Sequence, residues 1–325
     1  MIALMHSTFG EPADVVVPAE VPVPEPGAGE VRLRLLRSPI HNHDLATIRG
    51  IYGYKPKLPA IAGSELLGVV DAVGSGVTGV TVGMRAACGL RGAWAQFVIA
   101  PAAALVPVPG AIDDDRGCQL LAMPLSAVVL FDDLETAPDM WIAQNAAGGA
   151  VGRIVMQLAQ KAGVNIVNFV RRDDAAAELR GYGAQHVVVT EHEGWQEQAR
   201  ALTGGAGFAR IVDSVAGPQS LEYQRLLANG GELIVFGGLS GAAIKLDPSL
   251  MISQEATVRG FWMTSWMQRA TPEQRVAVTK RVFAMALANE LPLPVAGIYP
   301  LADAATALRA AQTPGRNGKV LFAPG

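Results

Sequence analysis

Cysteine is nearly absent from this 325-residue chain. Cys88 and Cys118 are the only two, so a disulfide framework is not expected, and free thiols fit a reducing compartment. Met1 to Gly10 lacks the basic region and cleavage site of a signal peptide, and we therefore expect a cytoplasmic protein. No apolar run reaches the roughly 18 residues that a membrane-spanning helix needs, so no membrane segment is expected.

Charge is also scarce. Only 17% of the residues are charged, the net charge is −3, and no dense basic run occurs. Nucleic-acid binding depends on clustered Lys and Arg, so we expect no nucleic-acid partner. Half of the residues are hydrophobic and 36 are glycines, which is typical of an α/β protein with many tight turns. The length suits two packed domains.

The two halves of the chain differ in pattern. Residues 1–115 read as short strands separated by Gly and Pro, and residues 30–36 alternate apolar and charged side chains as a half-buried strand does. From residue 116 onward, apolar strands alternate with helices. We expect strands at 140–144, 165–170, 186–189, 209–215, 232–236 and 257–262, and helices at 153–163, 173–183, 195–202, 218–229 and 271–290. This alternation predicts a doubly wound parallel sheet.

Two helix ends carry capping signals, and the last strand of the chain bears on the domain limits. Asp173 is a plausible N-cap for its helix, and Gly163 a stop for the preceding one. The final apolar strand, 318–325, is expected to return to the first domain. The sequence therefore predicts one β-rich domain of residues 1–115 with 285–325, and one nucleotide-binding domain of residues 116–284.

A glycine-rich turn lies between the strand at 140–144 and the helix that follows. Ala147, Gly149 and Gly152 have the spacing of a dinucleotide fingerprint, with Ala in place of the first Gly. Small residues let the backbone approach a pyrophosphate, and the helix N-terminus offers it unpaired N–H groups. A tight turn without a nucleotide is the alternative, but the strand–turn–helix–strand context favours a nucleotide site.

The end of the next strand predicts the cofactor. NAD-specific sites generally carry an acidic residue there, which binds the ribose 2′-hydroxyl. This chain has Arg171 and Arg172, whose guanidinium groups suit the 2′-phosphate of NADPH, with no acid expected to compete. Alternatively, both arginines are solvated surface charges. We expect NADPH.

A β-rich half followed by a nucleotide-binding half resembles the medium-chain dehydrogenase/reductase superfamily, nearly end to end. The resemblance implies a GroES-like β-rich domain and a Rossmann domain. Zinc-dependent members place a His at the position of Ser64 and a further ligand in the region of Met123, neither of which this chain has. His41 and His43 could contribute to a metal site, but a third ligand is missing. We expect no metal, so hydrogen bonds must stabilise any developing oxyanion, which favours reduction of activated C=C bonds.

Four segments narrow the resemblance: Arg49–Pro59, Gln144–Ala147, Phe236–Leu239, and Gly260–Trp262 with Trp266. They look like segments of the mitochondrial-type 2-enoyl thioester reductases. The resemblance implies that Tyr52 is the catalytic residue, with Tyr54 competing by proximity. A phenol donates a hydrogen bond at neutral pH, so it can stabilise an enolate or help to protonate its Cα. The alternative is an exposed loop aromatic.

The resemblance also implies cofactor contacts, and Phe261 to Met263 would line the acyl site as well. The implied contact residues are Asn145, Gly148, Gly149, Ala150, Val151, Gly152, Arg171, Arg172, Phe236, Gly237, Gly238, Leu239, Phe261, Trp262, Met263 and Lys319. Core packing is the alternative for the two later turns and for Trp262.

One departure concerns the substrate. Met123 stands where the family has an Asn before Pro, which removes a polar contact and makes the pocket more apolar. Three functions remain open: NADPH-dependent reduction of a 2-enoyl thioester of coenzyme A or acyl carrier protein, zinc-free reduction of quinones or enones, and NADPH binding without turnover. The family resemblance also implies a homodimer.

Overall fold

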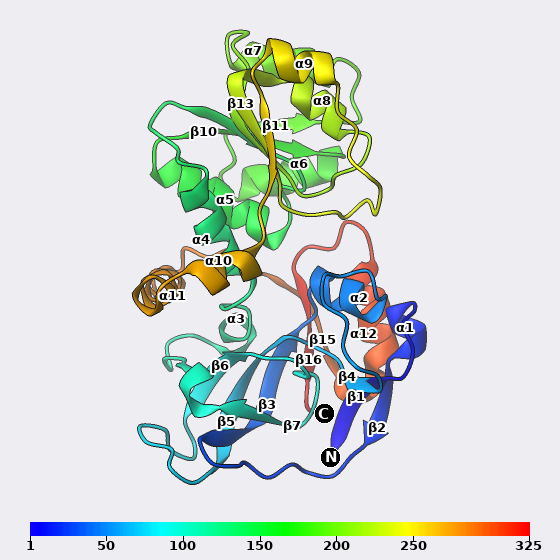
Figure 1. Ribbon diagram of the computed structural model, residues 1–325, viewed down its shortest axis with the longest axis vertical. Helices are drawn as coiled ribbons and strands as arrows, with labels where there is room; N and C mark the ends of the chain where they lie inside the picture. The colour runs from blue at the N-terminus through cyan, green and yellow to red at the C-terminus, as the bar shows by residue number, and fades with distance from the viewer. The chain divides into compact units, whose positions relative to one another are not determined.

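The computed structural model describes residues 1–325, and contacts between residues divide the chain into two units (Figure 1). The first unit contains Met1–Met123, Phe283–Asn289 and Leu293–Gly325. The second contains Pro124–Val282 and Glu290–Pro292. None of the helices combines the length and the apolar character that crossing a bilayer demands.

The first unit is built mainly from strands. A three-stranded sheet has the order β2-β1-β4, and a seven-stranded sheet has the order β15-β16-β3-β5-β6-β8, with β7 paired to β3. Their bounds are β1 (Ile2–His6), β2 (Val17–Glu20), β3 (Glu30–Pro39), β4 (Ala60–Ile61), β5 (Glu65–Val73), β6 (Arg85–Gly89), β7 (Phe97–Pro101), β8 (Val106–Pro107), β15 (Val295–Pro300) and β16 (Lys319–Ala323). The helices are α1 (Pro12–Val15), α2 (Asn42–Ile48), α3 (Asp114–Gly117) and α12 (Ala304–Gln312), with 3₁₀ turns η1 (Ala102–Ala104) and η2 (Leu301–Asp303).

Strand β3 shows why this sheet forms. Val31, Leu33 and Leu35 are fully buried, whereas the arginines between them lie on the other face, as the alternating pattern predicted. Strand β16 pairs antiparallel with β3, so the end of the chain joins the sheet built by its first half. The ring of Phe322 in β16 packs against Trp94 at 5.0 Å between centroids, inside the core of this unit.

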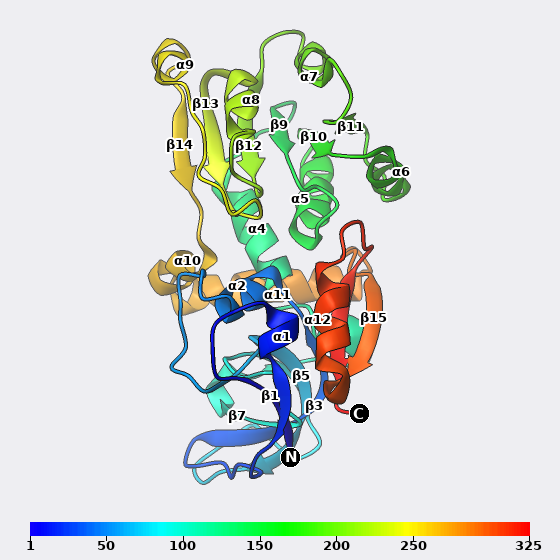
Figure 2. The same cartoon turned by 90° about the vertical axis from the view of Figure 1, so that its right-hand side faces the viewer.

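The second unit is a parallel six-stranded sheet with the order β11-β10-β9-β12-β13-β14, which Figure 2 shows from right to left. Its strands are β9 (Trp141–Gln144), β10 (Asn165–Val170), β11 (His186–Val189), β12 (Phe208–Asp213), β13 (Leu227–Val235) and β14 (Thr257–Gly260). Its helices are α4 (Met123–Asp133), α5 (Ala150–Lys161), α6 (Asp173–Gly181), α7 (Trp195–Leu202), α8 (Ser220–Arg225), α9 (Pro248–Ser253) and α10 (Met263–Arg269). Helix α11 (Pro272–Leu287) continues the chain into the first unit. The predicted doubly wound sheet is confirmed.

The strand order has a functional consequence. The chain starts at β9, moves out through β10 to β11, and then returns to the other side of β9 as β12. The direction of winding therefore reverses between β9 and β12, and ligands of such sheets bind at the carboxyl ends of the strands beside the reversal. Strand β10 is buried along almost its whole length, as a central parallel strand must be, with Phe169 packed on Trp195 and Tyr223.

Two local expectations were wrong. Asp173 is not the N-cap of α6, because the cap is Arg172, which makes no side-chain cap hydrogen bond; Asp173 is instead the first helical residue. The helix expected at 218–229 ends at Arg225, because the chain from Leu227 already pairs with β12 as strand β13. Sheet pairing thus replaces the last turn of the predicted helix.

Candidate active site

The predicted cofactor residues of the second unit lie at one edge of its sheet. They directly follow four strands, namely β9, β10, β13 and β14. Because these strands are parallel, their carboxyl ends meet at the same edge. This edge carries Asn145, Gly148, Gly149, Ala150, Val151, Gly152, Arg171, Arg172, Phe236, Gly237, Gly238, Leu239, Phe261, Trp262 and Met263. The structure brings these residues to one end of the sheet, and their contacts with a cofactor stay predictions.

The turn after β9 fits a pyrophosphate. Helix α5 has Gly149 as its N-cap, and no side chain caps its first N–H groups. Space is open at Gly148, where an added Cβ would meet nothing within 4 Å. At Gly152 an added Cβ would stand 2.7 Å from the Cα and carbonyl oxygen of Ala147, so the helix packs directly on the turn. An uncapped N-terminus beside open space suits a bound phosphate group.

A buried polar network holds this turn against the end of β12, and the sequence alone did not reveal it. The Asn145 amide donates to Asp213 Oδ1 at 2.6 Å and accepts from the Ser214 backbone N–H at 2.7 Å. The Ser220 hydroxyl donates to Asp213 Oδ2 at 2.6 Å. Burial raises the pKa of the neighbouring Tyr223 phenol. The Asn145 side chain therefore joins β9 to β12 across the reversal, and its direct contact with a cofactor stays a prediction.

A second buried amide fixes the start of α5. Gln144 Nε2 donates to the Gly152 carbonyl oxygen at 2.7 Å and to Asn168 Oδ1 at 2.8 Å. These bonds tie the strand before the turn to the helix after it and to β10. A buried amide without such partners would be costly, so both bonds stabilise the geometry of the turn.

The two arginines after β10 are not equivalent. Arg171 is exposed and takes part in no ion pair. Arg172 is held by the Asp174 carboxylate, with Nε–Oδ1 at 3.1 Å and Nη2–Oδ2 at 3.4 Å, and this pairing lowers the pKa of Asp174. The expectation that no acid competes is therefore wrong for Arg172. Arg171 is the guanidinium that remains available to a 2′-phosphate.

The turns after β13 and β14 lie against each other and against the end of β12. The rings of Phe236 and Phe261 are 5.8 Å apart, and an added Cβ at Gly237 would stand 2.7 Å from the Ser214 carbonyl oxygen. Phe261 is buried, whereas Trp262 is 47% exposed, which contradicts the core-packing alternative for Trp262. A cavity of about 300 Å³ opens here, lined by Asp133, Arg259, Gly260, Phe261, Trp262, Ser265 and Arg269.

The predicted catalytic tyrosine lies in the loop between α2 and β4 of the first unit. Tyr52 is partly exposed, and its ring lies 5.9 Å from the His43 ring. Tyr54, the competing candidate, packs beneath the Arg91 guanidinium, which stands 3.4 Å from its ring centroid. The loop thus gives the two tyrosines different surroundings, and Tyr54 is covered by a cation.

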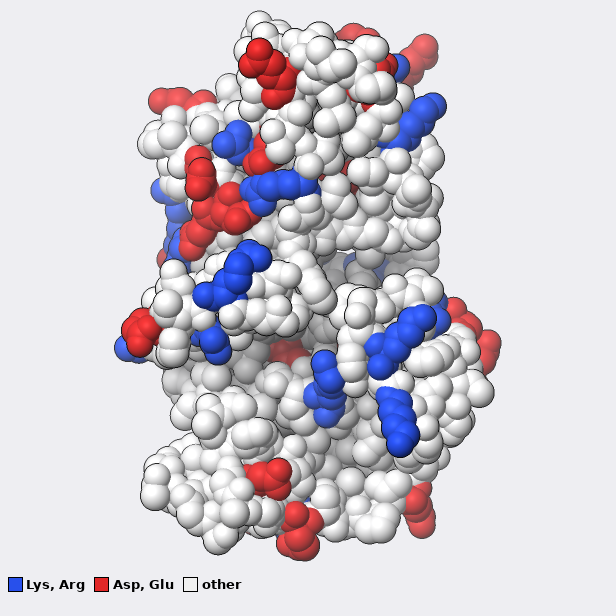
Figure 3. Space-filling view, in the orientation of Figure 1, with Lys and Arg blue, Asp and Glu red and all other residues white.

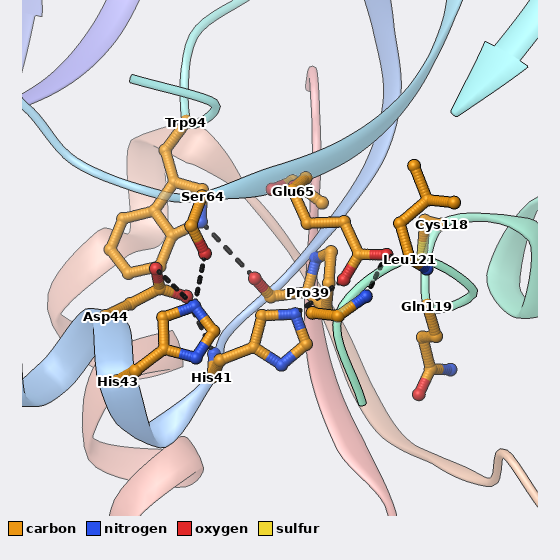
Figure 4. A network of polar contacts seen from close by, with 12 residues as sticks. Pro39, His41, His43, Asp44, Ser64, Glu65, Trp94, Cys118, Gln119 and Leu121 are labelled. Carbon is orange, nitrogen blue, oxygen red and sulfur yellow. Dashed lines mark hydrogen bonds and ion pairs between the residues drawn. The ribbon is translucent and has the colours of Figure 1, made fainter. Parts of the chain in front are cut away.

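His43 also belongs to a cluster of histidines and carboxylates, which Figure 4 shows. His41 Nε2 is 2.7 Å from Glu65 Oε2, and both side chains are completely buried. The other Glu65 oxygen accepts from the backbone N–H groups of Leu121 and Ala122 at 2.6 and 3.2 Å. His43 Nε2 lies 2.6 Å from the Ser64 hydroxyl. Each histidine therefore has a protein partner from the β5 side of the unit.

The surroundings of this cluster shift its proton affinities. Loss of water raises the pKa of Glu65 to about 7 and lowers the pKa of His41. Lys319, at the first position of β16, is also buried, which lowers its pKa to about 8. No group of three or more His, Cys, Asp or Glu side chains is placed to hold a metal ion. The cofactor contact expected of Lys319 stays a prediction.

Known proteins resemble the chain over nearly its full length. The alcohol dehydrogenase GroES-like domain family matches residues 27–110, and the zinc-binding dehydrogenase family matches residues 150–278. The human mitochondrial enoyl-[acyl-carrier-protein] reductase is 31% identical over 320 residues, which are 96% of this chain and 86% of that protein.

Solved structures share the fold of the whole chain. A Bacillus thuringiensis protein named as a candidate NADPH:quinone reductase is 27% identical, with a TM-score of 0.92, and the match covers 99% of this chain and 98% of that one. A mycobacterial protein solved in complex with NADPH is also 27% identical, with a TM-score of 0.89 and complete coverage of both chains.

Proposed function

The chain belongs to the medium-chain dehydrogenase/reductase superfamily, and on this basis we propose that it reduces the C=C bond of 2-enoyl thioesters. It is an NADPH-dependent oxidoreductase, so the alternative of NADPH binding without turnover is set aside. The human relative that acts on enoyl-[acyl-carrier-protein] supports the choice of substrate.

The residues of the second unit bind the cofactor in this proposal. The uncapped start of α5 receives the pyrophosphate, and Arg171 receives the 2′-phosphate. When bound, NADPH supplies a hydride. Phe236 and Phe261 provide an apolar surface that excludes water from the reacting end of the site.

Tyr52 provides the acid in the proposed reaction. Addition of hydride to Cβ of an enoyl thioester places negative charge on the thioester oxygen and on Cα. The Tyr52 hydroxyl donates a hydrogen bond to this enolate, or helps to protonate its Cα. His43, whose ring lies 5.9 Å away, is bonded to Ser64 and so is fixed beside the tyrosine.

One observation carries the proposal. Tyr52 and Tyr54 are both partly exposed, but the Tyr52 ring lies beside His43, whereas the Arg91 guanidinium lies over the ring of Tyr54. The two phenols therefore have different neighbours, and the proposal assigns the acid to Tyr52, which lies beside the bonded His43–Ser64 pair. The two tyrosines form a matched pair for an experiment.

The experiment follows NADPH absorbance with crotonyl-CoA and with a quinone, for the wild type, Tyr52→Phe and Tyr54→Phe. We expect Tyr52→Phe to lose crotonyl-CoA reduction and Tyr54→Phe to keep it. Quinone reduction without any reduction of crotonyl-CoA by the wild type would refute the proposal.

Reduction of quinones or enones with NADPH is the second candidate function. Met123 supports it, because this apolar side chain replaces the amide that the enoyl reductases have. The Bacillus thuringiensis structure supports it as well. The same NADPH assay separates the two functions, since reduction of a quinone forms no thioester enolate for the Tyr52 phenol to stabilise or protonate.

Location and assembly are part of the proposal too. Cys88 and Cys118 are both free and buried, which supports a reducing, cytoplasmic location. A homodimer stays a prediction, and sedimentation of the purified chain tests it.

A further inference from the structure

The loop that carries Tyr52 is positively charged in a chain that is negative overall. Residues 45–64 contain three cations, Arg49, Lys55 and Lys57, and no Asp or Glu. The whole chain has a net charge of −3. The positive charge is therefore concentrated beside the predicted catalytic residue.

Most of this charge is not neutralised. Lys55 and Lys57 are exposed, and neither takes part in an ion pair. Arg49 is different, because it pairs with Glu11 at 3.0 Å. Figure 3 shows Lys and Arg side chains as well as Asp and Glu side chains on the visible surface of the chain. Isolated lysines on a solvated surface are the alternative, but here both lysines fall within a stretch, residues 45–64, that contains no Asp or Glu.

Another cation, Arg91, is held against the same loop. Arg91 comes from the turn between β6 and β7, and its guanidinium lies 3.4 Å from the centre of the Tyr54 ring. Tyr54 stands between Tyr52 and Lys55 in the sequence, so this contact holds Arg91 beside the loop. We call Lys55, Lys57 and Arg91 the basic collar.

We propose that the basic collar binds the phosphate groups of the carrier to which the acyl group of the substrate is attached. This inference rests on the proposed reduction of enoyl thioesters. Such thioesters are carried on phosphopantetheine, whose phosphate occurs in both coenzyme A and acyl carrier proteins; coenzyme A adds further phosphates. Ammonium and guanidinium groups attract phosphate oxygens, and Arg binds them with two parallel hydrogen bonds. A neutral quinone would gain nothing from these charges.

The test uses one reacting group on three carriers. Crotonyl-CoA, crotonyl-phosphopantetheine and crotonyl-pantetheine share the same enoyl thioester but carry several phosphates, one phosphate and none. KM and kcat are measured with each, for the wild type, Lys55→Gln/Lys57→Gln and Arg91→Gln. Lys280→Gln, an exposed lysine of α11 without an ion pair, is the control for loss of charge.

Lys55→Gln/Lys57→Gln should raise KM for crotonyl-CoA about tenfold, as expected for the loss of two exposed charge contacts, with kcat nearly unchanged. Arg91→Gln removes one charge and should raise KM by a smaller factor. KM for crotonyl-pantetheine should stay within about twofold, which also shows that the variants are folded. An effect already present with crotonyl-phosphopantetheine assigns the collar to the phosphate shared with carrier proteins. An effect seen only with crotonyl-CoA assigns the collar to the nucleotide part of coenzyme A.

Two results would overturn the inference. KM for crotonyl-CoA could stay the same in the collar variants, or it could rise equally for crotonyl-CoA and crotonyl-pantetheine. If the wild type reduces none of the three thioesters, the proposed function itself fails, and the collar's role with it. Reduction of crotonyl-pantetheine by every variant distinguishes failure of the collar from failure of the reaction.

Discussion

Replacement of Arg171 by Ala should separate the two nicotinamide cofactors. Arg171 is the exposed, unpaired guanidinium at the end of β10, where the 2′-phosphate of NADPH is expected. A hydrogen bond to a charged group contributes about 1.5–3 kcal/mol, so its loss should raise the Kd of NADPH by about 10- to 100-fold. NADH lacks the phosphate, and its Kd should change by less than about twofold.

Arg172 provides the internal comparison. Asp174 already binds two of its nitrogens, at 3.1 and 3.4 Å, so Arg172→Ala should cost much less NADPH affinity than Arg171→Ala. Asp174→Asn should release Arg172 and tighten NADPH binding, since a neutral amide holds a guanidinium less strongly than a carboxylate does. We therefore expect Asp174 to weaken the preference for NADPH in the wild type.

The assay is titration of cofactor fluorescence with NADPH and with NADH at one fixed salt concentration. Arg180→Ala is the control, because Arg180 is an exposed arginine without an ion pair at the other end of α6. Equal losses of NADPH and NADH affinity in Arg171→Ala would refute the assignment of the 2′-phosphate. A larger loss in Arg172→Ala than in Arg171→Ala would refute the role given to Asp174.

Three further predictions test other parts of the site. Tyr52→Phe should lower kcat for crotonyl-CoA by about 100-fold or more, as expected for loss of a general acid, while NADPH affinity stays unchanged in the same fluorescence titration. Gly152→Ala should lower the free energy of unfolding by about 1–3 kcal/mol, because the added methyl group would stand 2.7 Å from the Ala147 backbone. Gly148→Ala meets open space and should leave this free energy unchanged. Equal melting temperatures of the two variants in thermal unfolding would contradict this packing. Burial raises the pKa of Glu65 from 4.5 to about 7, so the native state binds the carboxyl proton more tightly than the unfolded chain does. The free energy of unfolding should therefore fall by up to about 3 kcal/mol as the pH rises from 4.5 to 7. Glu65→Gln cannot titrate and should lose this part of the slope in urea unfolding, whereas parallel pH profiles would speak against the raised pKa.

The sequence alone predicted those features that depend on neighbouring residues. Alternating strands and helices indicated the parallel sheet, because each element needs its own apolar period. The glycine spacing placed the turn before α5, and the paired arginines fell at the end of β10 as expected. The return of the last strand to the first unit was also expected, whereas its pairing with β3 came from the structure. Local spacing predicted helix ends less well. Asp173 is the first residue of α6 and not its N-cap, and the residues after Arg225 form strand β13 instead of a last helical turn.

Only the tertiary structure decided which side chains meet. Asn145 and Asp213 are 68 residues apart, and they bond because β9 and β12 are neighbours in the sheet. Arg91 reaches Tyr54, and His41 reaches Glu65, through pairings that no short motif records. Burial then sets the proton affinities of these groups, since loss of water depends on everything packed around them. Residue types and their spacing determined the available chemistry, whereas strand order determined which groups are paired and which, like Arg171, remain available to a ligand.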